Sequence, residues 1–119
     1  MNKSNSNKIS SSKDLALIIK QTPIIVIKIS ASSCGPCKDK KFLESYNNIK
    51  TSCFENNKIK FIELDIDDNI EILEDKKYYN IDIEFIPTFL ISKNGSFIRK
   101  FVGGGYLNEI NEFIKDNIF

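Results

Sequence analysis

The chain has 119 residues, of which 41% are hydrophobic and 28% charged, and its formal net charge is +1 at pH 7. This length fits a single domain that buries its own core, and the composition is typical of a globular protein. Because the net charge is close to zero, it provides no general attraction to nucleic acid or to an anionic membrane, and we expect neither as a partner.

Residues 1–6 are polar and predict a disordered tail, so the folded domain is expected to span residues 7–119. Residues 1–13 lack the apolar stretch of a signal peptide, and no apolar run approaches the roughly 20 residues that cross a bilayer. We therefore expect a cytoplasmic protein. In that compartment structural disulfides are rare, and a close pair of cysteines is more often catalytic or metal-binding.

Hydrophobic periodicity predicts that strands alternate with helices in the first two thirds of the chain. Leu15, Ile18 and Ile19 recur at helical spacing, whereas Ile24–Ile29 is β-branched almost throughout, as in a strand buried on both faces. The expected elements are a strand near Lys8–Ser10, a helix over residues 11–20, a strand over 24–29, a helix over 34–54, a strand over 59–66 and a helix over 68–79.

The last third of the chain predicts a hairpin followed by a helix. Strands over residues 87–92 and 96–102 flank Asn94-Gly95, a strong signal for a tight turn. Apolar residues at helical spacing then predict an amphipathic helix over residues 107–118. The order βαβαβαββα indicates one α/β domain, with parallel pairing in its first part and an antiparallel hairpin at the edge of the sheet.

Two of the three cysteines lie close together, in the segment Cys34-Gly35-Pro36-Cys37. As a structural staple, a disulfide across so short a loop would contribute only about 2 kcal/mol. A metal site needs about four ligands, but the sequence has no histidine, and a straight helix would place Cys53 about 24 Å from Cys37. A metal cluster shared between two subunits is the metal-binding alternative that stays open.

A redox-active dithiol fits this segment better. With the next helix expected to begin at Cys34, the free N–H groups and the dipole of its first turn would favour a thiolate there. Cys37 lies one turn later and can attack a mixed disulfide formed at Cys34, while Pro36 suits a first turn because it needs no N–H partner. Cys53 shares an apolar helix face with Ile49, so we expect it to be a small buried residue of the core.

The segment SASSCGPCK (Ser30–Lys38) resembles the active-site segment of thioredoxins, in which Cys-Gly-Pro-Cys-Lys follows a buried strand. Further along, Ile86-Pro87-Thr88 resembles the family's Ile-Pro-Thr segment, Lys93-Asn94-Gly95 its hairpin turn and Val102-Gly103 the pair before its last helix. The resemblance covers residues 8–119. It implies the thioredoxin fold, a single domain with a central mixed sheet flanked by helices.

The resemblance also implies how the site works. Cys34 would be the exposed nucleophile and Cys37 the buried cysteine that resolves the mixed disulfide, with a cis proline, Pro87, facing the pair. The residues expected to contact an extended substrate segment are Ser33, Gly35, Pro36, Ile86, Pro87 and Gly103. No bound cofactor or metal is required. The expected partners are protein disulfide substrates and an external reductase that donates electrons, and the chain is expected to act as a monomer.

The sequence departs from the family pattern at three positions. Ser33 stands where thioredoxins usually carry tryptophan, and the chain contains no tryptophan, so an aromatic contact beside the nucleophile is missing. Phe42 replaces the proline that kinks the family's helix. Lys28 replaces the family's buried aspartate.

Lys28 is the single charge within an apolar strand, and an unpaired buried ammonium is unfavourable. Glu63 in the next strand is the expected partner, in a pair whose charges are swapped relative to thioredoxins. In that pair Glu63 would accept the proton of Cys37, and loss of either partner should be destabilising. The alternative is that Lys28 extends to the surface and pairs with nothing.

The sequence therefore predicts a thiol–disulfide oxidoreductase. By analogy, the Gly-Pro pair between the cysteines favours reduction of protein disulfides, since related oxidants and isomerases tend to carry histidine there. The missing tryptophan favours a first alternative, a dedicated oxidase or reductase with a single partner. The second alternative is a non-enzymatic binding module with the thioredoxin fold, in which the dithiol is incidental.

Overall fold

The structure, a computed structural model, describes residues 6–8, 12–31, 33–53, 56–66 and 85–118. Its elements follow in the order β1 (Ser6–Lys8), α1 (Ser12–Gln21), β2 (Ile24–Ser30), a 3-10 turn η1 (Pro36–Lys38), α2 (Lys40–Ser52), β3 (Ile59–Asp65), β4 (Thr88–Lys93), β5 (Ser96–Val102), a second 3-10 turn η2 (Gly104–Tyr106) and α4 (Leu107–Ile118). The first strand begins two residues before its expected place. Two expected segments lie outside the described residues: the helix over residues 68–79 and the first five residues of the tail.

The five strands form one mixed sheet in the order β1-β3-β2-β4-β5. β1 and β2 pair parallel with β3, whereas β4 pairs antiparallel with both β2 and β5. The turn between β4 and β5 places Asn94 and Gly95 at φ of 51° and 92°, and positive φ at both residues is what a two-residue type I′ turn requires. The expected parallel part with an antiparallel hairpin at the edge is confirmed.

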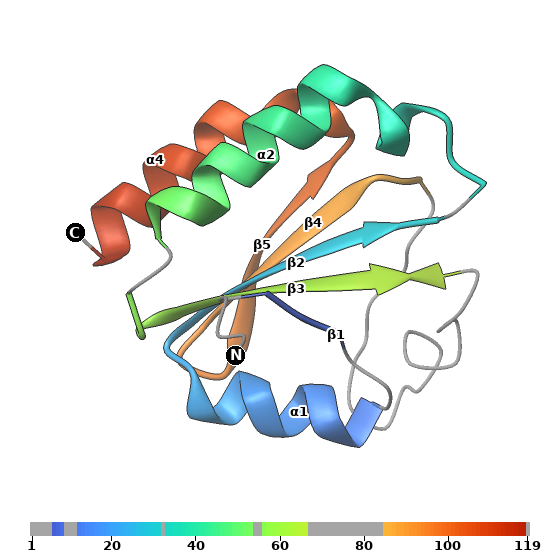
Figure 1. The fold of residues 1–119 in the computed structure, drawn as a ribbon. Coiled ribbons are helices and arrows are strands. Elements are labelled where there is room, and N and C mark those ends of the chain that lie inside the picture. The colour runs from blue at the N-terminus through green and yellow to red at the C-terminus, as the bar shows by residue number, and fades with distance from the viewer. Residues whose placement is uncertain (1–5, 9–11, 32, 54–55, 67–84, 119) are drawn as a thin grey trace.

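Helices cover both faces of this sheet. α2 and α4 lie together on one face, and α1 lies on the other (Figure 1). The central strand β2 is therefore covered from both sides, and its first six residues are buried, as its β-branched sequence predicts. Two clusters of core residues follow: Val26, Phe61, Phe89 and Ile91 pack with the α2–α4 layer, and Ile25, Ile27, Ile62 and Leu90 pack with α1.

The helix expected over residues 34–54 begins later than the sequence predicts. After η1, Asp39 adopts an extended conformation (φ −57°, ψ 129°), and α2 begins at Lys40. The Asp39 carboxylate accepts a hydrogen bond from the Phe42 N–H at 3.0 Å and so caps the first turn of α2. The apolar periodicity that predicts this helix begins only at Phe42, so it carries no information about where the helix starts.

Candidate active site

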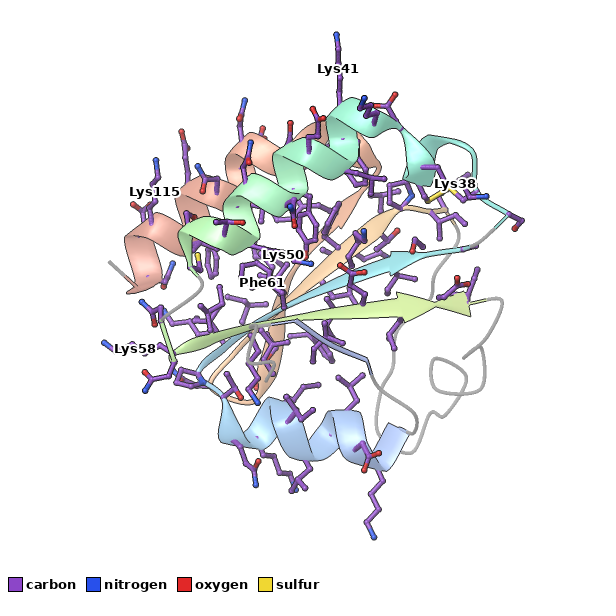
Figure 2. All side chains as sticks on the ribbon, in the orientation of Figure 1. Lys38, Lys41, Lys50, Lys58, Phe61 and Lys115 are labelled. Atoms are coloured by element: carbon purple, nitrogen blue, oxygen red, sulfur yellow. A yellow bond between two sulfur atoms is a disulfide. The ribbon has the colours of Figure 1, made fainter. Side chains whose placement is uncertain are left out.

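The cysteine pair lies in the loop that follows β2, where Figure 2 shows the disulfide beside Lys38. Cys34 and Cys37 are joined by this disulfide, with their Cα atoms 5.3 Å apart. The Cys34 N–H donates to the Ala31 carbonyl at 3.0 Å, and the Lys38 N–H donates to the Gly35 carbonyl at 2.9 Å, so the segment is a tight turn. Within it, the Cys37 N–H donates to the Cys34 sulfur at an N···S distance of 3.1 Å.

The hydrogen bond to the Cys34 sulfur changes the physical reason for expecting a thiolate there. Because α2 begins only at Lys40, the dipole of a long helix does not start at Cys34. The observed donor is instead the main-chain N–H of Cys37. A hydrogen bond donated to the charged form of a group favours that form, so we expect this N–H to stabilise the Cys34 thiolate once the disulfide is reduced.

The two cysteines differ little in exposure. In the disulfide form Cys34 is 8% exposed and Cys37 6% exposed. The exposed fractions of the two residues therefore do not show the expected contrast between an exposed nucleophile and a buried resolving cysteine. Ser33 and Gly35, on either side of Cys34, are exposed, and Pro36 begins the turn η1. Ser33 and Gly35 are therefore the exposed neighbours of Cys34 in the chain.

A second loop, before β4, lies against the cysteine pair. Ile86 packs against the small cluster that Ala31 forms with the two cysteines. The bond between Ile86 and Pro87 is cis, as the resemblance implies. The Pro87 carbonyl accepts a hydrogen bond from the Gly103 N–H at 2.7 Å. Of the expected substrate contacts, the structure thus brings Ile86 to the disulfide and Gly103 to Pro87.

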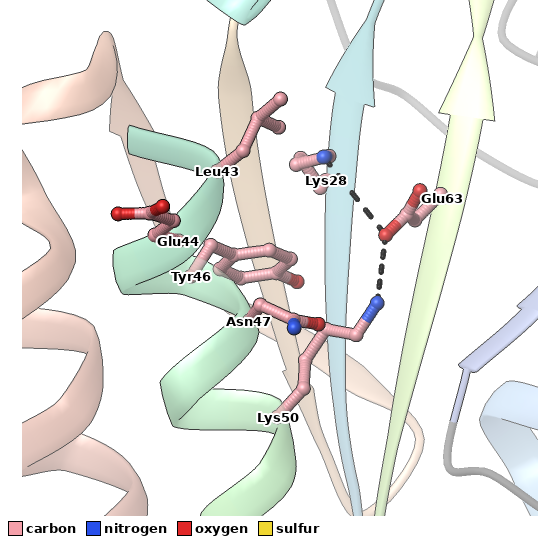
Figure 3. Close-up of a pocket in the computed structure, with 7 residues that line it drawn as sticks. All are labelled: Lys28, Leu43, Glu44, Tyr46, Asn47, Lys50 and Glu63. Atoms are coloured by element: carbon pink, nitrogen blue, oxygen red, sulfur yellow. Dashed lines mark hydrogen bonds and ion pairs between the residues drawn. The ribbon is translucent and has the colours of Figure 1, made fainter. Parts of the chain in front are cut away.

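A pocket of about 320 Å³ beneath α2 holds the charges expected at Lys28 and Glu63 (Figure 3). The two residues are neighbours in the parallel register of β2 and β3, and the Lys28 Nζ lies 3.9 Å from the Glu63 Oε2. Lys28 is 7% exposed, so the alternative in which it extends to the surface unpaired is wrong. Lys50 on α2 is closer to the carboxylate, because its Nζ donates to the same oxygen at 3.0 Å.

Lys50 is therefore a member of this charged group that the sequence analysis did not identify. Its amino group and that of Lys28 lie 5.7 Å and 5.2 Å from the centre of the Tyr46 ring. Lys50 follows Tyr46 by four residues, which places both on one face of a helix. That spacing is visible in the sequence, but a helical lysine is most often solvent-exposed, so nothing else marked this one.

Burial dominates the titration behaviour of this pocket. It lowers the pKa of the Lys28 ammonium, an effect that Glu63 opposes and Lys50 reinforces. Burial and the Glu63 charge raise the pKa of Tyr46 well above its usual value, and within the described part of the chain its hydroxyl has no hydrogen-bond partner. No cysteine is among the seven residues that line the pocket, so the role of Glu63 as proton acceptor for Cys37 stays a prediction.

Cys53 is a buried core residue, as the sequence predicts: it is 1% exposed and packs in the cluster that contains Phe42 and Ile49. Burial also raises the pKa of its thiol, which makes it a poor nucleophile.

We expect Cys53→Ala to keep disulfide turnover within about twofold of wild type and to lower the unfolding free energy by about 1 kcal/mol. Turnover assays and urea denaturation measure the two effects. A large loss of activity in a folded variant would reveal a third redox cysteine.

The arrangement of Cys34 and Cys37 is suited to exchange between thiols and disulfides. Two cysteines close a disulfide within one tight turn, and the pair reopens when it accepts two electrons. Within the described ranges, no group of three cysteine, aspartate or glutamate side chains is placed to hold a metal ion. No helix in the described part of the chain is long and apolar enough to cross a membrane.

Comparison with known proteins gives consistent matches over most of the chain. The family model described as Thioredoxin matches residues 7–116. Thioredoxin of Gallus gallus is 32% identical over 93 residues, which cover 77% of each chain. Thioredoxin 1 of Plasmodium falciparum is 30% identical over 96 residues, which cover 80% of this chain and 82% of that one. The crystal structure of oxidised mitochondrial thioredoxin 3 from Saccharomyces cerevisiae has a TM-score of 0.74 at 24% identity, covering 92% of this chain and 93% of that chain, and shows likeness of fold.

Proposed function

Since the chain belongs to the thioredoxin family and is a thiol–disulfide oxidoreductase, we propose that it works in the reducing direction, on the disulfides of other proteins. The Cys34–Cys37 disulfide carries the exchange chemistry, and the Gly35-Pro36 pair between the two cysteines supports the reducing direction by analogy with thioredoxins. We take the thioredoxin domain to begin at Ser6, the first residue of β1 and one residue before the expected boundary, with residues 1–5 as its tail.

The proposed reaction begins with the reduced pair. The Cys34 thiolate attacks one sulfur of the substrate disulfide, so that a Cys34–substrate bond forms while the substrate's own S–S bond breaks. The first substrate sulfur leaves as a thiolate and takes up a proton. The Cys37 thiolate then attacks Cys34, which forms the Cys34–Cys37 disulfide and releases the second substrate thiol. In total the dithiol passes two electrons and two protons to the substrate.

The loop before β4 is the proposed place for the substrate main chain. Ile86 lies against the disulfide, and its own main-chain groups can pair with an extended segment that carries the target cysteine. The exposed residues Ser33 and Gly35 border the same site, and Gly103 lies next to Pro87. These contacts support binding through main-chain geometry, which tolerates many substrate sequences.

An external reductase must restore the dithiol, because each cycle consumes two electrons. The thioredoxin family implies protein disulfide substrates and reductase partners in general. A reducing compartment suits this cycle. The curated relatives include mitochondrial thioredoxins of yeast and cattle, so a mitochondrial location fits the family as well as the cytoplasmic one that we expect from the sequence.

Ser33, which stands where thioredoxins usually carry tryptophan, favours a second candidate, a dedicated oxidase or reductase with a single partner. The reduction potential of the Cys34/Cys37 pair separates a reductase from an oxidase. We expect a value near the roughly −270 mV of thioredoxin, far from the roughly −120 mV of a strong oxidant. Equilibration with dithiothreitol and glutathione redox buffers gives the potential, and a turnover assay on insulin tests reduction of a general protein disulfide. A potential close to −120 mV, or no turnover of any protein disulfide, would contradict the proposal.

A further inference from the structure

Phe85 is the most exposed of the large hydrophobic residues in the described part of the chain. Its exposed fraction is 66%, compared with 54% for Leu17 on α1 and 44% for Ile98 on β5. A single apolar side chain on the surface is ordinary in itself. Phe85 differs from the other two because it directly precedes Ile86, which packs against the cluster that contains both cysteines.

The main chain of Phe85 is held in place beside the disulfide. Phe85 directly precedes Ile86, which packs against the cluster formed by Ala31, Cys34 and Cys37. Its carbonyl accepts a hydrogen bond at 2.6 Å from the hydroxyl of Thr88, a fully buried residue at the start of β4. The ring is therefore presented to solvent from a fixed backbone. An aromatic side chain held in this way loses little conformational freedom when a partner covers it.

The surroundings of Phe85 favour an apolar partner group. Val102, which pairs with Thr88 across β4 and β5, is 40% exposed, and Ile86 is partly exposed. Ser33, the exposed residue just before Cys34, contributes only a hydroxyl. Aromatic side chains bury large areas and supply much of the binding energy at protein interfaces. Among the described residues directly before and after Ile86 and Cys34, Phe85 carries the one aromatic ring, and that ring is well exposed.

We propose that Phe85 is a specificity-determining residue of the substrate site. It binds an apolar side chain of an extended protein segment, within a few residues of the cysteine whose disulfide Cys34 attacks. From the loop before β4, Phe85 supplies the aromatic contact that Ser33 cannot make. This inference rests on the proposed function and names its substrate class: protein disulfides flanked by apolar residues.

The test compares Phe85→Ser with the wild-type full-length chain in single turnovers. Each protein is reduced, freed of reductant and mixed with one of two disulfide-bonded peptides that differ only in a leucine or a serine next to the cysteine. We expect Phe85→Ser to lower the second-order rate constant for the leucine peptide about tenfold, because most of an apolar contact is lost. The rate constants for the serine peptide and for hydroxyethyl disulfide, which has no side chain to bind, should stay within about twofold.

Two further variants complete the test. Leu17→Ser removes a similarly exposed apolar side chain far along the chain from the site and should leave all three rate constants unchanged. Phe85→Trp keeps an aromatic ring and should keep the preference for leucine. An equal loss on all three substrates, or no loss on the leucine peptide, would overturn the role of Phe85 while wild-type activity still supports the proposed function. A wild-type chain that reduces neither peptide would overturn both.

Discussion

Replacing Cys34 by serine should abolish disulfide reduction, with turnover falling by at least about a thousandfold. A hydroxyl is not ionised at neutral pH, so the variant lacks the thiolate that begins the exchange. The fold should be unaffected, because serine is close in size to cysteine and the residue lies in a loop whose turn is held by main-chain hydrogen bonds. Insulin reduction with a chemical reductant measures the loss, and urea denaturation checks the fold.

Cys37→Ser should fail at the next step and therefore give a different result. Cys34 can still attack, but no second sulfur is present to release the substrate, so the mixed disulfide accumulates. Mass spectrometry of the trapped complex would locate the bond at Cys34 and identify the partner proteins. Cys53→Ala is the matched control, since it removes a buried sulfur outside the pair. A stable complex formed by Cys34→Ser through Cys37 would reverse the two roles.

The order of strands and helices followed from the sequence because apolar periodicity is strong wherever an element faces the core. β2 reads as a continuous β-branched run since helices cover it on both faces, and β5 and α4 have the predicted bounds. The predicted start of α2 was wrong for a local reason. The residues between Cys37 and Phe42 carry no apolar pattern, and the decisive feature there is one side-chain hydrogen bond, from the Phe42 N–H to Asp39.

The site was predictable to the extent that it lies in short motifs. The cysteine pair and the Ile86–Pro87 bond could be located because each occupies a few consecutive residues with distinctive types. The role of Lys50 could not be predicted from the sequence, because its long, flexible side chain contacts a residue 13 positions away, Glu63. Phe85 stands out only through its exposure, which depends on how the chain folds around it.

Removing the charge of Glu63 should destabilise the fold more than removing the charge of Lys28. In Glu63→Gln, the Lys28 ammonium stays buried and Lys50 is left as a second positive charge in the same pocket. Loss of one partner of a buried pair is strongly destabilising. The Glu63 side chain is 35% exposed and therefore partly screened by water. We expect Glu63→Gln to lower the unfolding free energy by about 2 kcal/mol, less than the loss of one partner from a fully buried pair.

Lys28→Met should behave differently, although the sequence alone predicts a loss for either partner. Methionine keeps the apolar stem and removes the buried ammonium, while Glu63 retains its hydrogen bond from Lys50 at 3.0 Å. We expect an unfolding free energy within about 1 kcal/mol of wild type. The double variant should recover most of the loss seen in Glu63→Gln, because the stranded charge is gone.

The pH dependence of stability gives an independent test of Lys28. Its pKa is lowered from 10.5 in the folded state, so the unfolded chain binds more protons just below that pH. Wild-type stability should therefore rise relative to Lys28→Met as the pH increases toward 10.5. The difference in stability between the two proteins removes the contributions of other titrating groups. Tyr46 is one of them: because its pKa is raised in the folded state, its contribution to stability falls as the pH rises above its usual pKa. A constant difference across this range would contradict a buried charged Lys28.

Glu44→Gln is the control for the whole series, since Glu44 lines the same pocket but is exposed on α2. It removes the same charge as Glu63→Gln and should leave stability within about 0.5 kcal/mol of wild type. Rapid-quench measurement of mixed-disulfide resolution at neutral pH then separates two roles for Glu63. If Glu63 accepts the proton of Cys37, Glu63→Gln slows resolution and Glu44→Gln does not. Equal resolution rates, together with the predicted loss of stability, would restrict Glu63 to holding the two lysines in place.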